Sequence, residues 1–203
     1  MLDYKFAFVA VCFMLALFSR VKCISVKDWG LLSCGLFFTL CADYFLVLHN
    51  RHLAGVAVFC FVHVAYIVRA VGFEKRMILP LGAAAGVWAG ALAAGSVVLL
   101  AGLYACLFGV NLFVNIKNRR TGINYYLVVA GLILFALCDV SVGLFNLSGY
   151  VGLPQYFSGA FMFIWIFYLP ALVLLAISAV DFNLSKRPEL VHEKICRHGD
   201  EHV

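Results

Sequence analysis

Two aspartates, Asp43 and Asp139, stand inside apolar stretches long enough to cross a membrane. A carboxyl group is costly in hydrocarbon, and acidic residues found there usually serve a proton relay, an ion path or a catalytic site. Two carboxylates that lie close together in a low dielectric cannot both ionise, so such a pair supplies one general acid and one carboxylate. The two sequence windows also match: each has Gly eight residues before the aspartate, Leu five after it and Asn seven after it, which gives Gly35, Leu48 and Asn50 in the first window and Gly131, Leu144 and Asn146 in the second.

The composition indicates the environment of these aspartates. The chain has 203 residues, of which 65% are hydrophobic and only 12% are charged. This is too apolar for a soluble domain and is typical of an all-α, polytopic transmembrane helical bundle. The net charge of +5 does not indicate a nucleic-acid partner, because the basic residues lie in short loops between apolar runs. We expect residues 1–182 to form the bundle and residues 183–203 to form a short hydrophilic tail.

Seven apolar runs reach, or come close to, the ~17–25 residues that a membrane-crossing helix needs. None of their flanks has the pattern of a cleavable signal peptide, so we expect the first run to be a true span. The runs cover residues 4–19, 29–48, 53–70, 77–93, 96–114, 125–145 and 156–180.

The loops between these runs alternate in charge. Thirteen Lys and Arg residues fall on one side of the predicted membrane, and only Lys5 and Arg51 fall on the other. By the positive-inside rule, the N-terminus lies outside and the C-terminus in the cytoplasm. The sequence therefore predicts a multi-pass integral membrane protein, which in a bacterium would lie in the cell membrane.

This topology predicts a common depth for the two aspartates. Asp43 is five residues from the end of its run and Asp139 is six from the end of its own, so at 1.5 Å per residue both lie ~8–9 Å below the outer ends of their helices. Seven residues make two helical turns, so Asn50 and Asn146 are expected on the same faces, at the rim of a shared cavity. Because the two helices run in the same direction, the match indicates a parallel internal repeat.

A longer pattern resembles the YhhN-like lysoplasmalogenase family. It consists of Cys-Ala-Asp-Tyr-Phe-Leu at residues 41–46, followed by an Asp…Gly-x-x-x-Phe-x-x-x-His-x-x-Tyr spacing that ends at His63 and Tyr66. In the second half, Leu-Cys-Asp at 137–139 and Phe-Tyr-Leu at 167–169 match the family's later helices. The chain has Ala42, Cys138 and Ala171 where many members have Gly, Ser and Gln. Family members usually have eight spans, so the resemblance implies that this chain lacks the first.

The resemblance implies hydrolysis of the vinyl-ether bond of lysoplasmalogens, with release of a fatty aldehyde and a glycerophospho-ethanolamine or -choline. The residue types suit this reaction, because an enol ether hydrolyses through proton transfer to carbon and an oxocarbenium ion that water traps. The lysophospholipid would enter from the bilayer. We expect Asp43 and Asp139 to be catalytic, and the substrate to be bound by His63, Tyr66, Asn50, Asn146 and Tyr168.

Other interpretations remain open. A proton-coupled transporter or carrier would use the same aspartates as a relay, although its broken helices usually meet at the midplane. A non-catalytic scaffold would leave the common depth of the aspartates unexplained.

The remaining polar and small residues have simpler interpretations. Asn111 and Asn115, one turn apart, are expected to be packing or interface groups. The residues Gly82, Gly86 and Gly90 offer a flat face for close helix contact. No motif indicates a cofactor, and the His and Cys residues of the tail match no zinc pattern, so we expect no metal.

Overall fold

The computed structural model describes the backbone of residues 4–74, 77–118, 122–151 and 154–182, and the side chains of these residues except 4 and 146–161. Within these ranges the chain is helical and contains no strand, apart from a bridge between Cys23 and Val180. The predicted tail at 183–203 lies outside the described residues. In chain order the elements are α1 (Tyr4–Phe18), η1 (Ser19–Lys22), α2 (Val26–Asp43), η2 (Tyr44–Leu48), α3 (His52–Val71), α4 (Ile78–Ala93), α5 (Val97–Lys117), α6 (Ile123–Val151) and α7 (Pro154–Ile177).

The helices of the described chain correspond to the seven apolar runs, which confirms the all-α class. Four of them are long and apolar enough to cross a membrane: Val26–Leu48, His52–Val71, Val97–Lys117 and Ile123–Phe145. α4 and the segment Met162–Ile177 are apolar but shorter. The predicted number of seven spans and the predicted orientation stay predictions.

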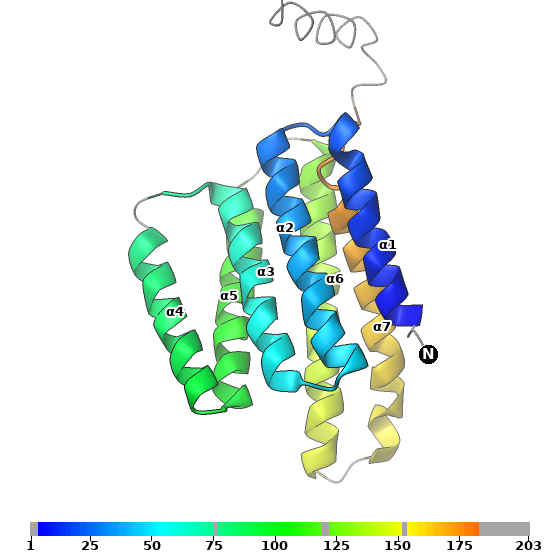
Figure 1. The fold of residues 1–203 in the computed structure, drawn as a ribbon. Helices are drawn as coiled ribbons and strands as arrows, with labels where there is room; N and C mark the ends of the chain where they lie inside the picture. Colours follow the sequence, from blue (N-terminus) through cyan, green and yellow to red (C-terminus); the bar gives the residue numbers. More distant parts are fainter. Residues whose placement is uncertain (1–3, 75–76, 119–121, 152–153, 183–203) are drawn as a thin grey trace, which may run out of the picture.

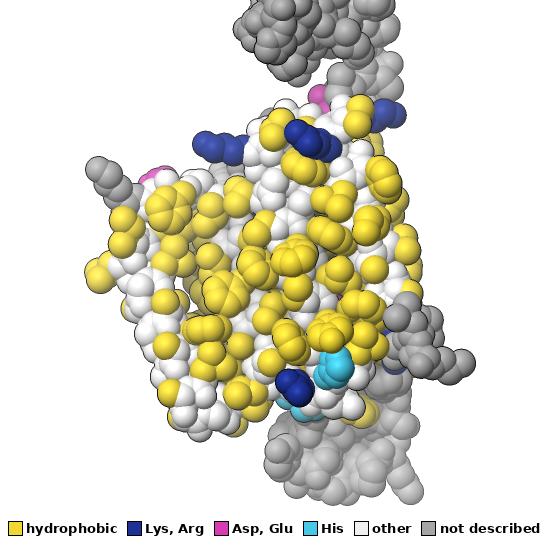
Figure 2. Space-filling view, in the orientation of Figure 1, with side chains coloured by type: hydrophobic (Ala, Val, Ile, Leu, Met, Phe, Trp, Pro, Cys, Tyr) yellow, Lys and Arg dark blue, Asp and Glu magenta, His cyan; other side chains and the backbone are white. Residues whose placement is uncertain are grey.

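The seven α-helices of the described chain alternate in direction, so the bundle has two distinct ends (Figure 1). We call the end where α2 and α6 begin the basic end, and the opposite end, where both aspartates lie, the aspartate end. Figure 2 shows Lys and Arg side chains gathered at the basic end and Lys or Arg again at the aspartate end, with a largely hydrophobic surface between the two ends. The segregation of basic residues that the sequence predicts is therefore built into the helix arrangement.

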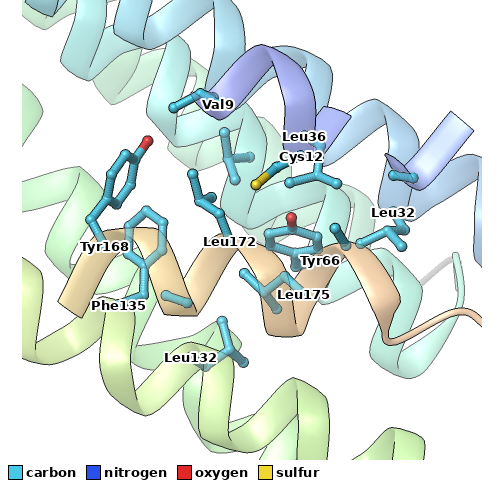
Figure 3. Packing of buried hydrophobic residues seen from close by; sticks show 14 of the residues in the cluster. Val9, Cys12, Leu32, Leu36, Tyr66, Leu132, Phe135, Tyr168, Leu172 and Leu175 are labelled. Carbon is cyan, nitrogen blue, oxygen red and sulfur yellow. The ribbon is translucent and has the colours of Figure 1, made fainter. Parts of the chain in front are cut away.

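The core lies between α1, α2, α3, α6 and α7, and consists almost wholly of apolar side chains (Figure 3). Leu32 and Leu36 of α2 meet Leu172 and Leu175 of α7 in this cluster. Its aromatic members occupy different levels: Tyr168 lies beside Phe135, whereas Tyr66 lies further along, near Leu36.

Two glycines allow each aspartate-bearing helix to approach the helix that follows it. A Cβ at Gly35 would lie 2.8 Å from Cε1 of Tyr66 on α3, and one at Gly131 would lie 3.0 Å from Cγ of Leu175 on α7. The first distance is too short for a real side chain, and the second is tight enough that Leu175 would have to shift. The glycines that stand eight residues before Asp43 and Asp139 therefore both permit close helix packing, while the predicted internal repeat stays a prediction.

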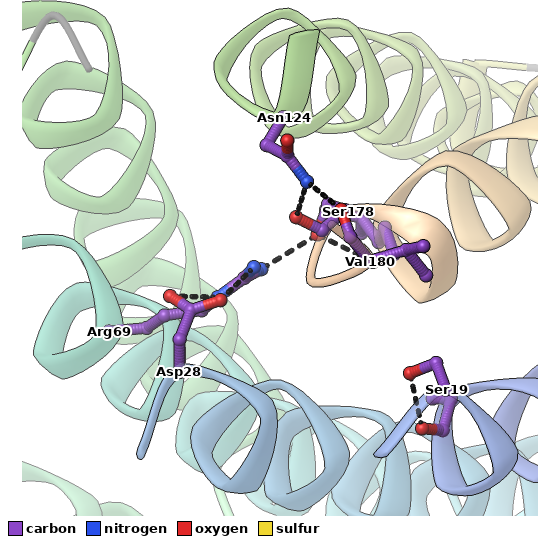
Figure 4. A network of polar contacts seen from close by, with 8 residues as sticks. Ser19, Asp28, Arg69, Asn124, Ser178 and Val180 are labelled. Atoms are coloured by element: carbon purple, nitrogen blue, oxygen red, sulfur yellow. Dashed lines mark hydrogen bonds and ion pairs between the residues drawn. The ribbon is translucent and has the colours of Figure 1, made fainter. Parts of the chain in front are cut away.

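A buried ion pair ties the helices together at the basic end (Figure 4). Arg69 of α3 donates from Nε and Nη2 to the carboxylate of Asp28 on α2, and from Nη1 to the Ser178 hydroxyl after α7. Asn124 of α6 donates to the backbone oxygens of Ser178 and Val180. The starts of α2 and α6 are thus linked through one short segment.

α4 lies at the edge of the bundle and packs mainly along α5 (Figure 1). The expected close-contact face of α4 does not pack against the described chain, because a Cβ at Gly82, Gly86 or Gly90 would meet nothing within 4 Å. The small residues leave α4 with few protruding side chains, and in this structure that flat face is exposed.

Candidate functional site

Asp43 ends α2 and is held by a residue from the last helix. Its side chain is 4% exposed, and its Oδ2 accepts a hydrogen bond from the Tyr168 hydroxyl of α7 at 2.5 Å. A hydroxyl hydrogen bond to a carboxyl group in a buried site is strong and fixes the orientation of that group. Tyr168, which the sequence predicts to belong to the site, therefore contacts a predicted catalytic residue directly.

Asp139 is held in the same way by a different helix. Its Oδ2 accepts a hydrogen bond of 2.6 Å from the Tyr104 hydroxyl of α5. Each carboxyl group thus has one oxygen bound by a tyrosine, and each tyrosine comes from a helix other than the one that carries the aspartate. We call these two units the Asp–Tyr pairs.

The two Asp–Tyr pairs lie at matching levels along parallel helices. Asp28 stands fifteen residues before Asp43, and Asn124 stands fifteen residues before Asp139. Since Arg69 and Ser178 link Asp28 and Asn124 at the basic end, each aspartate lies ~22 Å from the same reference level. Both carboxyl groups also interact electrostatically with the Cys138 thiol. The two aspartates therefore lie at a similar level of the bundle. The predicted distance to the helix end is wrong for Asp139, because α6 continues to Val151 and Asp139 lies ~18 Å before that end. The predicted depth in the membrane and the predicted shared cavity stay predictions.

Aromatic rings connect the two pairs. Phe135 of α6, which is 3% exposed, has its ring centroid 5.5 Å from that of Tyr168 and 6.1 Å from that of Phe59. The Phe59 ring in turn lies 6.0 Å from that of Tyr104. Most of these contacts are edge-to-face, so the site walls present both the positive edges and the negative faces of aromatic rings.

His63 lies next to the second pair but bonds neither aspartate. It is 1% exposed, and its ring centroid is 4.8 Å from that of Tyr104. Its Nδ1 lies 3.3 Å from Nδ2 of Asn111, which is wholly buried on α5. The expectation that Asn111 is only a packing or interface group is therefore incomplete, because it holds His63.

The asparagines on α5 select the tautomer of His63. Asn115 donates from Nδ2 to both the backbone oxygen and Oδ1 of Asn111. The amide NH₂ of Asn111 must therefore be the group that faces His63, so Nδ1 of the neutral imidazole accepts and Nε2 carries the proton. Within the described chain this buried N–H has no hydrogen-bond partner, and it is available to donate to an oxygen in the site.

The backbone changes its helical form immediately after Asp43. Residues Tyr44–Leu48 form the π-helical turn η2, and Asn50 follows it with a left-handed φ of 52°. Wide turns of this kind are frequent at functional sites. They also break the α-helical spacing, so the expectation that Asn50 tops the same face as Asp43 is wrong. Asn50 is exposed in the connection to α3, and the side chain of Asn146 lies outside the described residues.

Tyr66 lies away from the aspartates. It packs over Gly35, eight residues before Asp43 and hence ~12 Å along α2. Its hydroxyl is buried without a hydrogen-bond partner in the described chain. The predicted substrate-binding role of Tyr66 is thus separated from the carboxyl groups by about two helical turns.

A pocket of about 600 Å³ lies at the basic end and includes neither aspartate. It is bounded by the network of Arg69, Asp28 and Ser178 and by side chains of α5 and α6. Asn115 lines this pocket and is the first member of the polar series that continues through Asn111 to His63.

The most important residue that sequence reasoning missed is Tyr104. A pattern that points to it exists, because Tyr104, Phe108, Asn111 and Asn115 recur at the spacing of one helix face and all four contact the site or its support. Tyrosines and asparagines in apolar helices are common, however, and only the fold shows which acid or histidine they face.

The fold and site define a class of protein: an all-α bundle in which several helices are long and apolar enough to cross a membrane, with one buried and one partly buried Asp–Tyr pair toward one end. No family model, curated protein or solved structure matches the chain.

Proposed function

We propose that this protein is an intramembrane hydrolase that cleaves the vinyl-ether bond of lysoplasmalogens, as its resemblance to the YhhN-like lysoplasmalogenase family implies. The observation that carries the proposal is the presence of two Asp–Tyr pairs at one level of the bundle. Paired carboxyl groups in a water-poor site are the groups that acid-catalysed cleavage of an enol ether requires.

The reaction needs one proton donor and one carboxylate. A protonated aspartate transfers its proton to the β-carbon of the vinyl ether, which gives an oxocarbenium ion at the carbon bonded to oxygen. The second aspartate, as carboxylate, stabilises this cation and takes a proton from the attacking water. The resulting hemiacetal loses the glycerol oxygen as an alcohol, and the fatty aldehyde remains. One water is consumed and no oxidant or cofactor is needed.

The tyrosines position the carboxyl groups for these two roles. In each pair the tyrosine occupies one carboxyl oxygen, which leaves the other oxygen to carry or accept the proton. Phe135 lies between the pairs, and the negative face of an aromatic ring favours a nearby cation such as the oxocarbenium ion. The Nε2–H of His63 is suited to hold the attacking water or the departing oxygen.

A lipid substrate would approach from the bilayer at the aspartate end. The two basic residues described at this end are Lys5 and Arg51. The Lys5 ammonium lies 4.3 Å from the ring centroid of Trp165, whose ring neighbours that of Tyr168 at 5.8 Å. A headgroup phosphate bound near Lys5 would leave the ether bond, which lies only a few bonds deeper, near the Asp43–Tyr168 pair.

A proton-coupled carrier is the second candidate. The observation that favours it is the buried polar series from Asn115 through Asn111 and His63 to the neighbourhood of Asp139, which connects the basic-end pocket with the Asp–Tyr pairs. A carrier would use this series to bring polar groups or water across the bundle.

The deciding experiment incubates the purified protein with a lysoplasmalogen and with a saturated ether lysolipid of equal length. We expect aldehyde release from the vinyl ether alone, and a fall of at least ~10²-fold when Asp43 or Asp139 is replaced by Asn. Asp181→Asn, outside the site, is the matched control. Aldehyde release that persists in the double variant Asp43→Asn/Asp139→Asn would remove the pair from the mechanism, and proton flux without aldehyde would indicate the carrier.

A further inference from the structure

The pocket at the basic end is a second polar site of the molecule. It lies where α2, α3, α5 and α6 meet, and Ser178 after α7 closes one side. Its volume of about 600 Å³ is within the range of small-molecule sites. Because it lies ~22 Å from the aspartates, one lysolipid cannot fill it with its headgroup while its ether bond lies between Asp43 and Asp139. Its ligand is therefore separate from the substrate in the reacting position.

Three asparagines give this pocket an excess of hydrogen-bond acceptors. Asn115 donates to Asn111, Asn118 donates to the backbone oxygen of Ala70, and Asn124 donates to the backbone after α7. Each amide NH₂ is thus used within the protein. The three carbonyl oxygens accept no hydrogen bond from the described chain, and all three residues line the pocket. Such a set of oxygens suits a ligand with several N–H donors.

The charges of the pocket suit a ligand that carries an anionic group next to its N–H donors. Arg69 and Asp28 neutralise each other in a buried ion pair. Lys27 also lines the pocket and is exposed, with no ion pair or hydrogen bond to the described chain. Ser25 adds a hydroxyl that is not used to cap α2. One cation and one hydroxyl at the mouth, with amide oxygens along α5 and α6, match a zwitterion that has a phosphate at one end and an ammonium at the other.

The lining distinguishes a primary ammonium from a quaternary one. A trimethylammonium group has no N–H donors and is usually held by several aromatic rings. Tyr125 is the one aromatic residue in the described lining. A primary ammonium, in contrast, can donate up to three hydrogen bonds to the amide oxygens.

We propose that this pocket binds a phosphoethanolamine group, with its ammonium on the oxygens of Asn115, Asn118 and Asn124 and its phosphate on Lys27 and Ser25. Leu31, Val68 and Val128 supply an apolar wall for the glycerol and the first part of a chain. The group can come from a phosphatidylethanolamine in the adjacent leaflet or from free glycerophosphoethanolamine. This proposal does not depend on the vinyl-ether activity.

The test measures lipid retention and soluble binding on the purified full-length protein. Native mass spectrometry would compare phosphatidylethanolamine, phosphatidylcholine and phosphatidylglycerol with identical chains, and equilibrium dialysis would use radiolabelled glycerophosphoethanolamine. We expect preferential retention of phosphatidylethanolamine, by about tenfold, if the ammonium makes charge-assisted hydrogen bonds. Dialysis binding without lipid retention would support the same site with a soluble ligand.

Two variants address the site itself. Lys27→Gln should weaken binding about tenfold through loss of the charged contact with phosphate, whereas Lys22→Gln, at the same end but outside the pocket lining, should not. Val71→Phe should reduce binding by filling space, with Val98→Phe, 81% exposed on α5, as its control. Thermal unfolding checks that each variant folds. Equal retention of ethanolamine and choline lipids without dialysis binding of glycerophosphoethanolamine, or unchanged binding by both Lys27→Gln and Val71→Phe, would overturn the proposal.

Discussion

The hydroxyl of Tyr168 bonds Asp43 at 2.5 Å although the two residues are 125 positions apart in the sequence. Their helices lie at opposite ends of the chain, so the last helix completes the environment of an acid that the second helix supplies. The other pair differs, because Tyr104 and Asp139 come from adjacent helices. The matching sequence windows thus indicate the positions of the two acids but not which helices supply their tyrosine partners.

The two tyrosine hydroxyls should matter for turnover. Tyr168→Phe and Tyr104→Phe each remove one hydrogen bond to a carboxyl group, which typically costs 1.5–3 kcal/mol, so kcat for aldehyde release should fall by about ten- to a hundredfold. KM should change little, because the lost interaction orients an acid rather than the lipid. Tyr126→Phe, with an exposed ring, is the control. Unchanged kcat in both site variants would contradict the positioning role.

The sequence predicts the helices well because apolar length and charge alternation are strong signals in a membrane chain. It also predicts that the two aspartates lie at a similar level, since a constant helical rise converts spacing into distance along the axis, but it does not predict that α6 continues to Val151. Tyr168 is predicted as a site residue because Phe-Tyr-Leu at 167–169 resembles a helix of the YhhN-like family. These features depend on local sequence or on direct similarity.

The partners of His63 and Asp139 depend instead on which helices become neighbours. Asn111 and Tyr104 belong to α5, and apolar periodicity does not specify which face of α5 meets α3 and α6. The prediction that Asn50 lies on the same helix face as Asp43 fails for another reason. The π-helical turn at Tyr44–Leu48 changes the number of residues per turn just after Asp43. Leu46 of this turn packs against Gly55 of α3, where a Cβ would lie 2.3 Å from Cγ of Leu46.

Gly35 offers a test of the packing between α2 and α3. Gly35→Ala places a Cβ 2.8 Å from the Tyr66 ring, so it should destabilise the protein by about 1–3 kcal/mol, as overpacked cores do. Gly30→Ala in the same helix meets nothing within 4 Å and should be neutral or slightly stabilising. The measurement is thermal or denaturant unfolding in detergent. Adding Tyr66→Leu to Gly35→Ala should restore part of the loss, and a failure to do so would show that the ring is not the obstacle.

Lys5 provides a test of substrate approach from the aspartate end. If the headgroup phosphate lies near Lys5, Lys5→Gln should raise KM by about two- to fivefold, the scale of a partly exposed ion pair, and leave kcat nearly unchanged. Lys22→Gln, at the basic end, should leave both parameters unchanged. Equal effects of the two substitutions would indicate a general membrane-charge effect, and an effect of Lys22→Gln alone would place entry at the opposite end.

The pH dependence separates the hydrolase from the carrier. The reaction needs one aspartate protonated and the other ionised, so kcat should follow a bell-shaped curve. At low pH the carboxylate gains a proton and can no longer take one from water, and at high pH the acid loses the proton that the vinyl ether needs. The two limbs belong to the coupled pair rather than to either residue alone.

The two Asp→Asn variants should differ in their pH profiles. Replacing the acid by Asn removes the proton donor, so aldehyde release should be lost at all pH values. Replacing the base by Asn should leave weak aldehyde release that only declines as pH rises. The rates should be measured by aldehyde trapping, in parallel with proton flux in liposomes. A flat profile for aldehyde release would contradict the paired-acid mechanism, and pH-dependent proton flux that both Asp→Asn changes abolish, without any aldehyde, would favour the carrier.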